Sequence, residues 1–335
     1  NNFIAFLVSL IILAFIQYVV IPGIPTLASK FELLFVNGMG LPFGTGNFIY
    51  AIILISFIIF CIWYTKKKGK ALLNTAVLFI TFVIIGYSSY AVTVIRSLAN
   101  PPLNENNPSN VFSLLSFLNR EQYGDRPLFY GPYYNAPYAR DMSGNVVQDK
   151  GSPIYIMGDK KYEKVGYKMK TKYNTEYCTF FPRMYSSEDK HVMAYKAWTG
   201  IRGNRKPTFA ENIKFFLRYQ LGFMYNRYFL WNFSGRQNDI QSHGVDENGN
   251  RDFINGNWIS GIPFIDARLG NQDKLPPDLA NNKAKNKFYM LPLLLGLVGL
   301  FFHIKQSKKD AWVVFLLFFM TGIAIILYLN QTPYQ

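Results

Sequence analysis

Charged residues are scarce in this sequence. Only 16% of its 335 residues are Asp, Glu, Lys or Arg, whereas about a quarter are charged in a typical soluble domain. Half of the residues are hydrophobic, and they gather in long runs near both ends of the chain, with a polar stretch between them. This distribution argues against one soluble domain. It predicts a membrane layer and a separate polar domain that is long enough to bury its own core.

The sequence also lacks the short motifs of common catalytic and metal sites. It contains no GxSxG, no phosphate-binding glycine loop, no HExxH and no CxxC, and its three histidines are far apart. We therefore expect no structural zinc site. The two cysteines, Cys61 in an apolar run and Cys178 in the polar stretch, are not expected to form a disulfide.

One polar stretch resembles a calcium loop, because oxygen-bearing side chains alternate in it. These are Asp246, Asn248, Asn250 and Asp252. However, Arg251 stands where a calcium loop of the EF-hand type needs glycine, and Asn257 stands where it needs a bidentate glutamate. We interpret the stretch as a solvated turn and predict no metal.

The net charge of +15 raises the question of a nucleic-acid partner. A nucleic-acid-binding protein is expected to show a basic stripe or a recognisable motif, and the sequence has neither. Lysines instead cluster in two short turns between apolar runs, at 66–70 and 305–309, and the other basic residues are scattered through the central region among carboxylates. We predict no nucleic-acid partner and interpret these lysines as signals of membrane orientation.

Five apolar segments are candidates for membrane-spanning helices, which need about 20 mostly apolar residues. None of the five contains Asp, Glu, Lys or Arg, which disfavours the alternative of buried helices in a soluble protein. The segments are Phe3–Ile21, Phe48–Tyr64, Leu72–Val94, Phe288–Ile304 and Trp312–Leu329. They predict a polytopic α-helical membrane protein with about five transmembrane helices, and the lipid bilayer as its first partner.

The lysine-rich turns orient these helices, because short basic loops stay in the cytoplasm. With both turns inside, residues 22–47 form an outer loop and residues 95–287 form a large extracytoplasmic domain. The predicted organisation is three transmembrane helices in 1–94, the outer domain in 95–287 and two transmembrane helices in 288–335. Both ends of the sequence are abrupt, so we expect a fragment of a longer protein.

A further apolar segment, 211–233, contains Lys214, Arg218 and Arg227. Each of these charges is costly at the centre of a bilayer. A crossing here would also contradict the orientation given by the lysine-rich turns. We therefore predict an amphipathic helix that lies at the membrane interface, with its basic side chains reaching the headgroups.

The outer domain is predicted to be mixed α/β with long loops. Prolines and asparagines disfavour regular structure in Asn100–Asn110, and Val111–Leu118 is predicted as a short helix with Ser or Asn caps before it. Three short runs have the character of strands: Pro153–Met157, Tyr162–Tyr167 and Tyr177–Pro182.

Three stretches of the outer domain carry candidate binding residues. Glu105 and Asn106 follow directly after a membrane segment, where a carboxylate could act as a base or bind sugar hydroxyls; the alternative is a solvated loop. Arg126 offers a guanidinium for phosphate, and Tyr133 offers a ring for a sugar face. The alternative for Tyr133 and its neighbouring tyrosines is an aromatic core, and the residues support sugar binding and an aromatic core about equally.

The third stretch follows the interfacial helix and contains Trp231 and Arg236. The phosphate of a lipid-linked substrate would lie near the membrane surface, where Arg236 could hold it and Trp231 could stack on a sugar. The alternative is a polar cap that ends the helix. These six residues are the candidate substrate-binding set.

The stretches at 100–137, 218–241 and 255–270 together resemble a bacterial family of polytopic membrane proteins of unknown function. That family is itself similar to the protein O-mannosyltransferases of the C-type glycosyltransferase superfamily, and the resemblance covers most of Leu72–Gln335. It implies a glycosyltransferase in the bacterial inner membrane, with its large domain in the periplasm. The implied donor is a polyprenyl-phosphate sugar and the implied acceptor is a protein or glycan, with no covalently bound cofactor.

The sequence departs from this family in one respect. The resemblance implies an acidic catalytic motif in the first outer loop, but the only carboxylate before Val94 is Glu32. The catalytic residue is therefore left unassigned and is expected in a missing N-terminal part. The alternative function is a membrane scaffold or docking component of an envelope or secretion assembly. A transporter is ranked last, because transport sites need polar or broken helices at mid-membrane.

Overall fold

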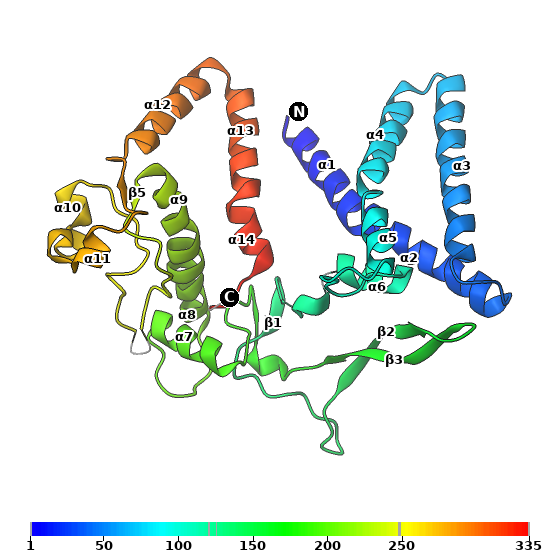
Figure 1. The fold of residues 1–335 in the computed structure, drawn as a ribbon, viewed down its shortest axis with the longest axis horizontal. Helices are drawn as coiled ribbons and strands as arrows, with labels where there is room; N and C mark the ends of the chain where they lie inside the picture. Colours follow the sequence, from blue (N-terminus) through cyan, green and yellow to red (C-terminus); the bar gives the residue numbers. More distant parts are fainter. Residues whose placement is uncertain (1, 120, 125, 247–248, 334–335) are drawn as a thin grey trace. The chain divides into compact units, whose positions relative to one another are not determined.

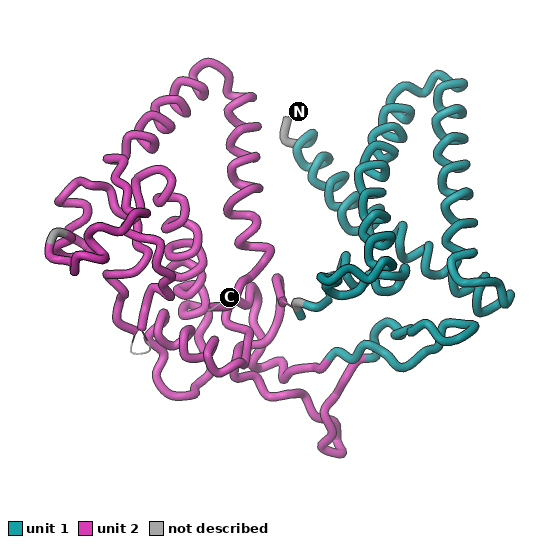
Figure 2. Tube along the Cα trace, viewed as in Figure 1, with its two compact units in different colours: residues 1–125, 150–170 teal, residues 126–149, 171–335 magenta. Residues whose placement is uncertain are grey.

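The computed structural model describes residues 2–119, 121–124, 126–246 and 249–333, which fall into two compact units (Figure 2). Unit 1 comprises residues 1–125 and 150–170, and unit 2 comprises residues 126–149 and 171–335. Each unit combines long apolar helices with part of the polar region. The large polar stretch predicted as one domain is thus shared between the two units.

Unit 1 begins with one uninterrupted helical stretch. It consists, in order, of α1 (Asn2–Phe15), the π-helical turn η1 (Ile16–Val20), α2 (Ile21–Glu32) and a second π-helical turn, η2 (Leu33–Gly38). Pro22 and Pro25 lie inside this stretch, and each lacks a backbone donor. Neighbouring π-helical turns absorb such irregularities without ending the helix. Most of the predicted outer loop, residues 22–38, is therefore helical.

The other long helices of unit 1 follow directly (Figure 1): α3 (Thr45–Lys67), α4 (Ala71–Tyr87) and α5 (Tyr90–Leu98). The lysine-rich turn joins α3 to α4, and only Ser88 and Ser89 separate α4 from α5. In unit 2, the last helices are α12 (Leu291–Gln306), α13 (Lys308–Thr321) and α14 (Ile323–Leu329).

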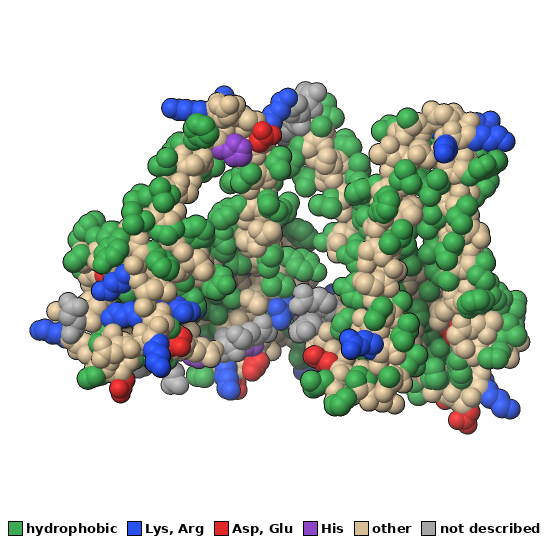
Figure 3. Space-filling view, turned by 45° about the horizontal axis from the view of Figure 1, so that its top comes forward, with side chains coloured by type: hydrophobic (Ala, Val, Ile, Leu, Met, Phe, Trp, Pro, Cys, Tyr) green, Lys and Arg blue, Asp and Glu red, His purple; other side chains and the backbone are tan. Residues whose placement is uncertain are grey.

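Within the described residues, four helical stretches are long and apolar enough to cross a membrane: Ile4–Gly38, Thr45–Lys67, Ala71–Leu98 and Lys308–Leu329. They correspond to four of the five predicted segments. At most 11% of the most apolar window of each stretch is buried, so hydrophobic side chains cover the helices on the outside (Figure 3). Apolar faces of this extent fit a membrane protein, because they would be exposed to water otherwise.

The fifth predicted segment forms a short helix that begins and ends two or three residues later than predicted. α12 has 16 residues and is about 24 Å long at 1.5 Å per residue, less than the hydrocarbon core of about 30 Å. Its start is set by Tyr289 and Met290, whose φ angles of 52° and 57° lie in the left-handed region, outside the helix. The structure thus has four long apolar helices and one short one.

The polar part of unit 1 contains a short helix and a hairpin. Helix α6 (Val111–Leu118) begins in a capping box between Asn110 and Ser113, which confirms the helix and the cap predicted from the sequence. Strands β2 (Gln148–Met157) and β3 (Tyr162–Thr171) form a two-stranded sheet. This pair confirms two of the three predicted strands and extends both.

Tyr162 joins the hairpin to the end of the first helical stretch. Its backbone amide donates to Oδ1 of Asn37 at 2.9 Å, and its carbonyl accepts from Nδ2 of Asn37 at 2.7 Å. Its hydroxyl donates to Oε1 of Glu32 at 3.2 Å. Glu32 is fully buried, and its carboxylate also accepts from the amides of Gly44 and Asn47 at 2.6 and 3.0 Å, at the start of α3. These bonds fix the hairpin to two helices.

Unit 2 has an aromatic core. The buried cluster comprises Tyr134, Met184, Tyr195, Ile201, Phe215 and Tyr219. Tyr195 lies on α7 (Asp189–Thr199), and Phe215 and Tyr219 lie on a continuous helical stretch of α8 (Phe209–Phe215), η5 (Phe216–Asn226) and α9 (Arg227–Phe233). The other three come from the segments between the regular elements. The segment predicted as an interfacial helix is therefore helical, and the structure places one of its faces in this core.

Small elements complete unit 2. Strand β1 (Tyr130–Pro132) pairs antiparallel with β4 (Cys178–Phe180), and β5 (Gly235–Arg236) pairs with β6 (Asn286–Lys287). Strand β4 confirms the third predicted strand. Two four-residue helices follow, α10 (Pro263–Asp266) and α11 (Pro277–Ala280). Cys61 and Cys178 lie in different units, and both are free thiols.

The end of α14 is held by polar side chains from the start of unit 2. Asn330 is fully buried at φ 42°, and its Nδ2 donates to the carbonyls of Pro127 and Pro182 at 2.8 and 2.9 Å. Its Oδ1 accepts from Nε2 of Gln220 at 3.2 Å. Arg183 donates to the carbonyl of Leu327 at 3.0 Å. These contacts join the last helix to three distant segments.

We expect Asn37→Ala to loosen the β2–β3 hairpin, because it removes both hydrogen bonds to the backbone of Tyr162. Two hydrogen bonds of about 0.5–1.5 kcal/mol each correspond to roughly 5- to 150-fold faster local exchange. Hydrogen–deuterium exchange of the hairpin amides measures this change. Asn145→Ala, at an exposed loop position, is the control, and equal exchange in both variants would contradict the anchoring.

Asn330→Gly should destabilise unit 2 by about 2–4 kcal/mol, because buried carbonyls lose their donors while glycine still tolerates the positive φ. Thermal and denaturant unfolding in detergent measure the loss. Asn281→Gly is the matched control, since Asn281 caps α11 at an exposed position. Equal stability of the two variants would show that the contacts of Asn330 do not hold α14.

Candidate functional site

The α4–α5 junction is a polar break in an apolar helix. The hydroxyls of Ser88 and Ser89 donate to the carbonyls of Ile85 and Gly86 at 2.6 and 2.9 Å. Such local hydrogen bonds compete with the helical ladder and mark a bend. Beyond the break, α5 has two chemically distinct faces, and each face lines a different cavity.

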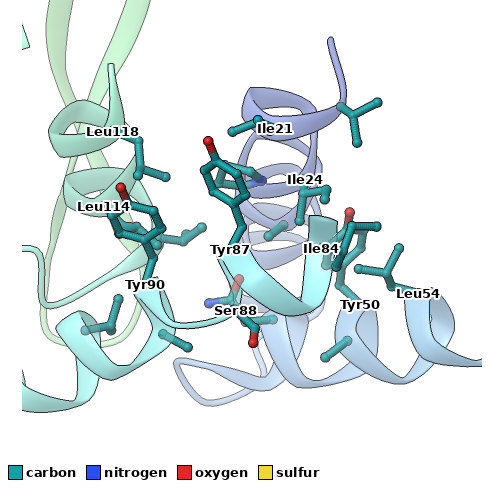
Figure 4. A pocket seen from close by; sticks show the side chains of 18 of the residues that line it. Ile21, Ile24, Tyr50, Leu54, Ile84, Tyr87, Ser88, Tyr90, Leu114 and Leu118 are labelled. Atoms are coloured by element: carbon teal, nitrogen blue, oxygen red, sulfur yellow. The ribbon is translucent and has the colours of Figure 1, made fainter. Parts of the chain in front are cut away.

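The first cavity is apolar and has a volume of about 490 Å³. It is enclosed by α2, α3, α4, α5 and α6 of unit 1. Figure 4 shows aliphatic side chains around it, among them Ile21 and Ile24 of α2 and Leu114 of α6, together with the rings of Tyr87 and Tyr90. A volume of this order is typical of ligand-binding pockets. The lining suits a hydrocarbon chain.

The second cavity lies on the opposite face of α5, is polar, and has a volume of about 540 Å³. Its shape depends on Ser97, whose buried hydroxyl lies 2.9 Å from Oδ1 of both Asn104 and Asn107. Nδ2 of Asn104 donates back to the carbonyl of Ser97 at 3.2 Å. This network holds the loop so that Glu105 and Arg96 both line the cavity.

The structure divides the six candidate residues between the units. Glu105 and Asn106 are exposed neighbours at the tip of the loop after α5, where Asn106 has a φ of 61°. Asparagine tolerates this left-handed backbone better than most residues. The other four candidates, Arg126, Tyr133, Trp231 and Arg236, belong to unit 2.

Arg126 contacts the end of a helix, and Tyr133 is buried inside unit 2. Nη1 of Arg126 donates to the carbonyl of Leu329 at 3.1 Å, at the end of α14, where a cation also complements the helix dipole. Tyr133 is only 3% exposed, and burial raises the pKa of its hydroxyl. Tyr133 thus contributes to the interior of unit 2, whereas Tyr130 and Tyr138 are more than half exposed.

Trp231 and Arg236 lie together, as their place in the sequence suggests. The guanidinium carbon of Arg236 is 5.7 Å from the centre of the Trp231 ring, and that of Arg227 is 4.5 Å from it. Both distances are within the range of cation–π attraction. The buried Nε1 of Trp231 has no hydrogen-bond partner in the described part of the chain. A tryptophan flanked by two guanidinium groups suits a sugar that carries negative charge.

Two residues in these sites, Arg96 and Arg227, and the buried Glu32 have contacts that the sequence does not predict. The only signal for Arg96 is a basic residue at the last turn of an apolar segment. Arg227 was assigned to the headgroups, but it contacts Trp231 and donates to the carbonyl of Gly256 at 3.0 Å. Glu32 was noted as an isolated carboxylate, and isolation in a long apolar stretch was the available signal of its buried contacts.

Among the residues with described positions, no group of three or more His, Cys, Asp or Glu side chains is arranged to hold a metal ion. Asn248 of the calcium-like stretch lies outside the described residues. Asp246 accepts hydrogen bonds from the amide and Nδ2 of Asn250 at 2.7 and 2.9 Å, the arrangement expected for a polar turn.

Comparison with known proteins identifies a partial similarity. A family model described as a family of unknown function (DUF8416) matches residues 124–217, which span the aromatic core and the first part of the α8–α9 helical stretch. No curated protein and no solved structure matches the chain. The matched description names no activity, so the similarity to protein O-mannosyltransferases stays a prediction.

Proposed function

We propose that the chain is part of a membrane glycosyltransferase that moves a sugar from a polyprenyl-phosphate donor to a protein or glycan. The observation that supports this is the pair of cavities beside α5: one apolar, the other polar and lined by Arg96 and Glu105. A lipid-linked sugar needs both environments within a short distance. A helix with its side chains is about 10–12 Å wide, so one helix width separates them.

In this mechanism the acceptor hydroxyl attacks the anomeric carbon, and the bond between that carbon and the phosphate oxygen breaks. Glu105 takes the proton of the hydroxyl as general base. Arg96 stabilises the charge that develops on the departing polyprenyl phosphate. Asn106, beside Glu105 in the same loop, offers an amide for sugar hydroxyls. Within unit 2, Trp231 and Arg236 are a separate pair suited to a sugar and a phosphate.

The proposal includes an orientation. With the lysine-rich turns in the cytoplasm, the loop that carries Glu105 opens on the other side of the membrane. In the inner membrane of a bacterium, that side is the periplasm. The chain would then be a multi-pass protein that acts on substrates at the outer face, with residues 95–287 outside.

A transfer assay tests the proposal. The protein in its full-length form is incubated with polyprenyl-phosphate mannose, or with other polyprenyl-phosphate sugars, and with membrane protein acceptors. Ala91→Phe should lower transfer at least about tenfold, because the added ring fills the apolar cavity that Ala91 lines. Arg96→Gln and Glu105→Gln should lower it by a similar or larger factor, through loss of leaving-group stabilisation and of the base.

Ala76→Phe is the matched control, because Ala76 lies on α4 at an exposed position outside the cavity lining. Transfer that is unaffected in all three cavity variants would refute this site but not the enzyme class. Absence of transfer with every donor would favour a docking or scaffold role instead.

That second function has one observation in its favour. The β2–β3 hairpin exposes apolar side chains, including Ile156 at 48%, Val165 at 57% and Met169 at 49%. Exposed apolar strands are common at protein–protein contacts. The transfer assay distinguishes the two functions, because a scaffold would move no sugar.

A further inference from the structure

A third cavity, of about 470 Å³, lies wholly within unit 2 and is separate from the two cavities beside α5. Its aromatic walls come from Trp198 of α7, Phe223 of η5 and Trp258. Gly244 allows the loop to pass close to these rings: it has a φ of 79°, and a side-chain carbon there would lie 2.6 Å from both Trp198 and Phe223. The loop at Gly244 is therefore closely packed against the two rings.

Three arginines line this cavity: Arg218, Arg227 and Arg251. No Asp or Glu occurs among the described residues that line it. Arg218 and Arg251 are exposed, and neither forms an ion pair within the described part of the chain. Like charges gathered in one cavity repel each other, so an anion bound between them would be stabilised strongly.

Two acidic side chains of the described part of the surrounding loops form hydrogen bonds within those loops. Asp252 accepts from the hydroxyl of Ser242 and from two backbone amides, and Asp266 accepts from the amides of Ser260 and Gly261. These hydrogen bonds to backbone and hydroxyl donors satisfy both carboxylates. Asp252 and Asp266 therefore stabilise the loops, and among the described residues neither forms an ion pair with Arg218 or Arg251.

A fourth arginine, Arg268, does not line the cavity but stacks on Trp258, which does. The carbon of the Arg268 guanidinium lies 3.6 Å from the centre of the Trp258 ring. Its buried Nε and Nη1 have no hydrogen-bond partner among the described residues. Burial and, to a smaller degree, the nearby charge of Arg251 lower the pKa of Arg268 to about 10, so it is still cationic at neutral pH.

We infer that this cavity is a binding site for a phosphate-bearing ligand, either a soluble sugar phosphate or the phosphorylated head of a lipid. Guanidinium groups bind phosphate oxygens through paired, charge-assisted hydrogen bonds. The tryptophan rings offer apolar faces on which a sugar can stack. The inference goes beyond the transfer reaction, because it concerns phosphate binding in this cavity, which among the described residues shares only Arg227 with the surroundings of Trp231.

Tryptophan fluorescence provides the test, since two tryptophans line the cavity. The full chain, in nanodiscs of phosphatidylcholine, is titrated with inorganic pyrophosphate and with mannose 1-phosphate. Arg218→Gln and Arg251→Gln should each weaken binding about tenfold or more, through loss of charge-assisted hydrogen bonds. Arg202→Gln, at an exposed position outside the cavity lining, should bind as the wild type does.

A second arm distinguishes the two sources of the phosphate. Nanodiscs that contain phosphatidylglycerol should weaken the binding of pyrophosphate if a lipid headgroup occupies the cavity, and Arg251→Gln should abolish that competition. Unchanged pyrophosphate affinity with phosphatidylglycerol assigns the site to a soluble ligand. The inference is overturned if the wild type in phosphatidylcholine binds neither phosphate probe, or if both cavity variants bind them as tightly as Arg202→Gln does.

Discussion

Polar groups at helix ends, buried against apolar surroundings, are the constraint on which both units depend. At the start of α3 the backbone amides donate to the carboxylate of Glu32, and at the end of α14 the carbonyls accept from Arg183 and Arg126. A buried polar group without a partner costs about 1–3 kcal/mol, so these capping side chains are firmly placed. Because Glu32 also binds Tyr162 and Asn330 also binds two loop carbonyls, each cap fixes a distant segment as well.

The elements that were predictable from the sequence are those with local causes. Long charge-free runs predict apolar helices, and Asn110 before an apolar turn predicts the start of α6. The length of the first helix was not predictable in this way. Pro22 and Pro25 normally end a helix, and the π-helical turns that accommodate them leave no recognisable pattern. The short α12 has a similar explanation, since no local rule places Met290 in the left-handed region.

The candidate residues also differ in whether their surroundings have a local cause in the sequence. Glu105 follows a membrane segment directly, so its place beside a polar cavity could be inferred from sequence order. Trp231 and Arg236 are near neighbours, and their contact was also predictable. The roles of Tyr133 and Arg126 were not, because they depend on α14 and on β4, which come much later in the chain. A tyrosine-rich stretch has the same composition whether its rings face a sugar or a core.

The positive charge of the chain has two physical origins. Seven of the 23 lysines occupy the turns at 66–70 and 305–309, where a compact and strongly hydrated ammonium suits the membrane surface, and most of the others are spread over residues 150–287. Arginines lie among rings: Arg183 is 3.7 Å from the centre of Phe181, Arg227 is 4.0 Å from that of Phe223, and Arg268 is 3.6 Å from that of Trp258. A planar, weakly hydrated guanidinium tolerates such places without a carboxylate beside it. The lysines of the turns are thus the basis of the predicted orientation, whereas the arginines of unit 2 create a field that a bound anion can neutralise.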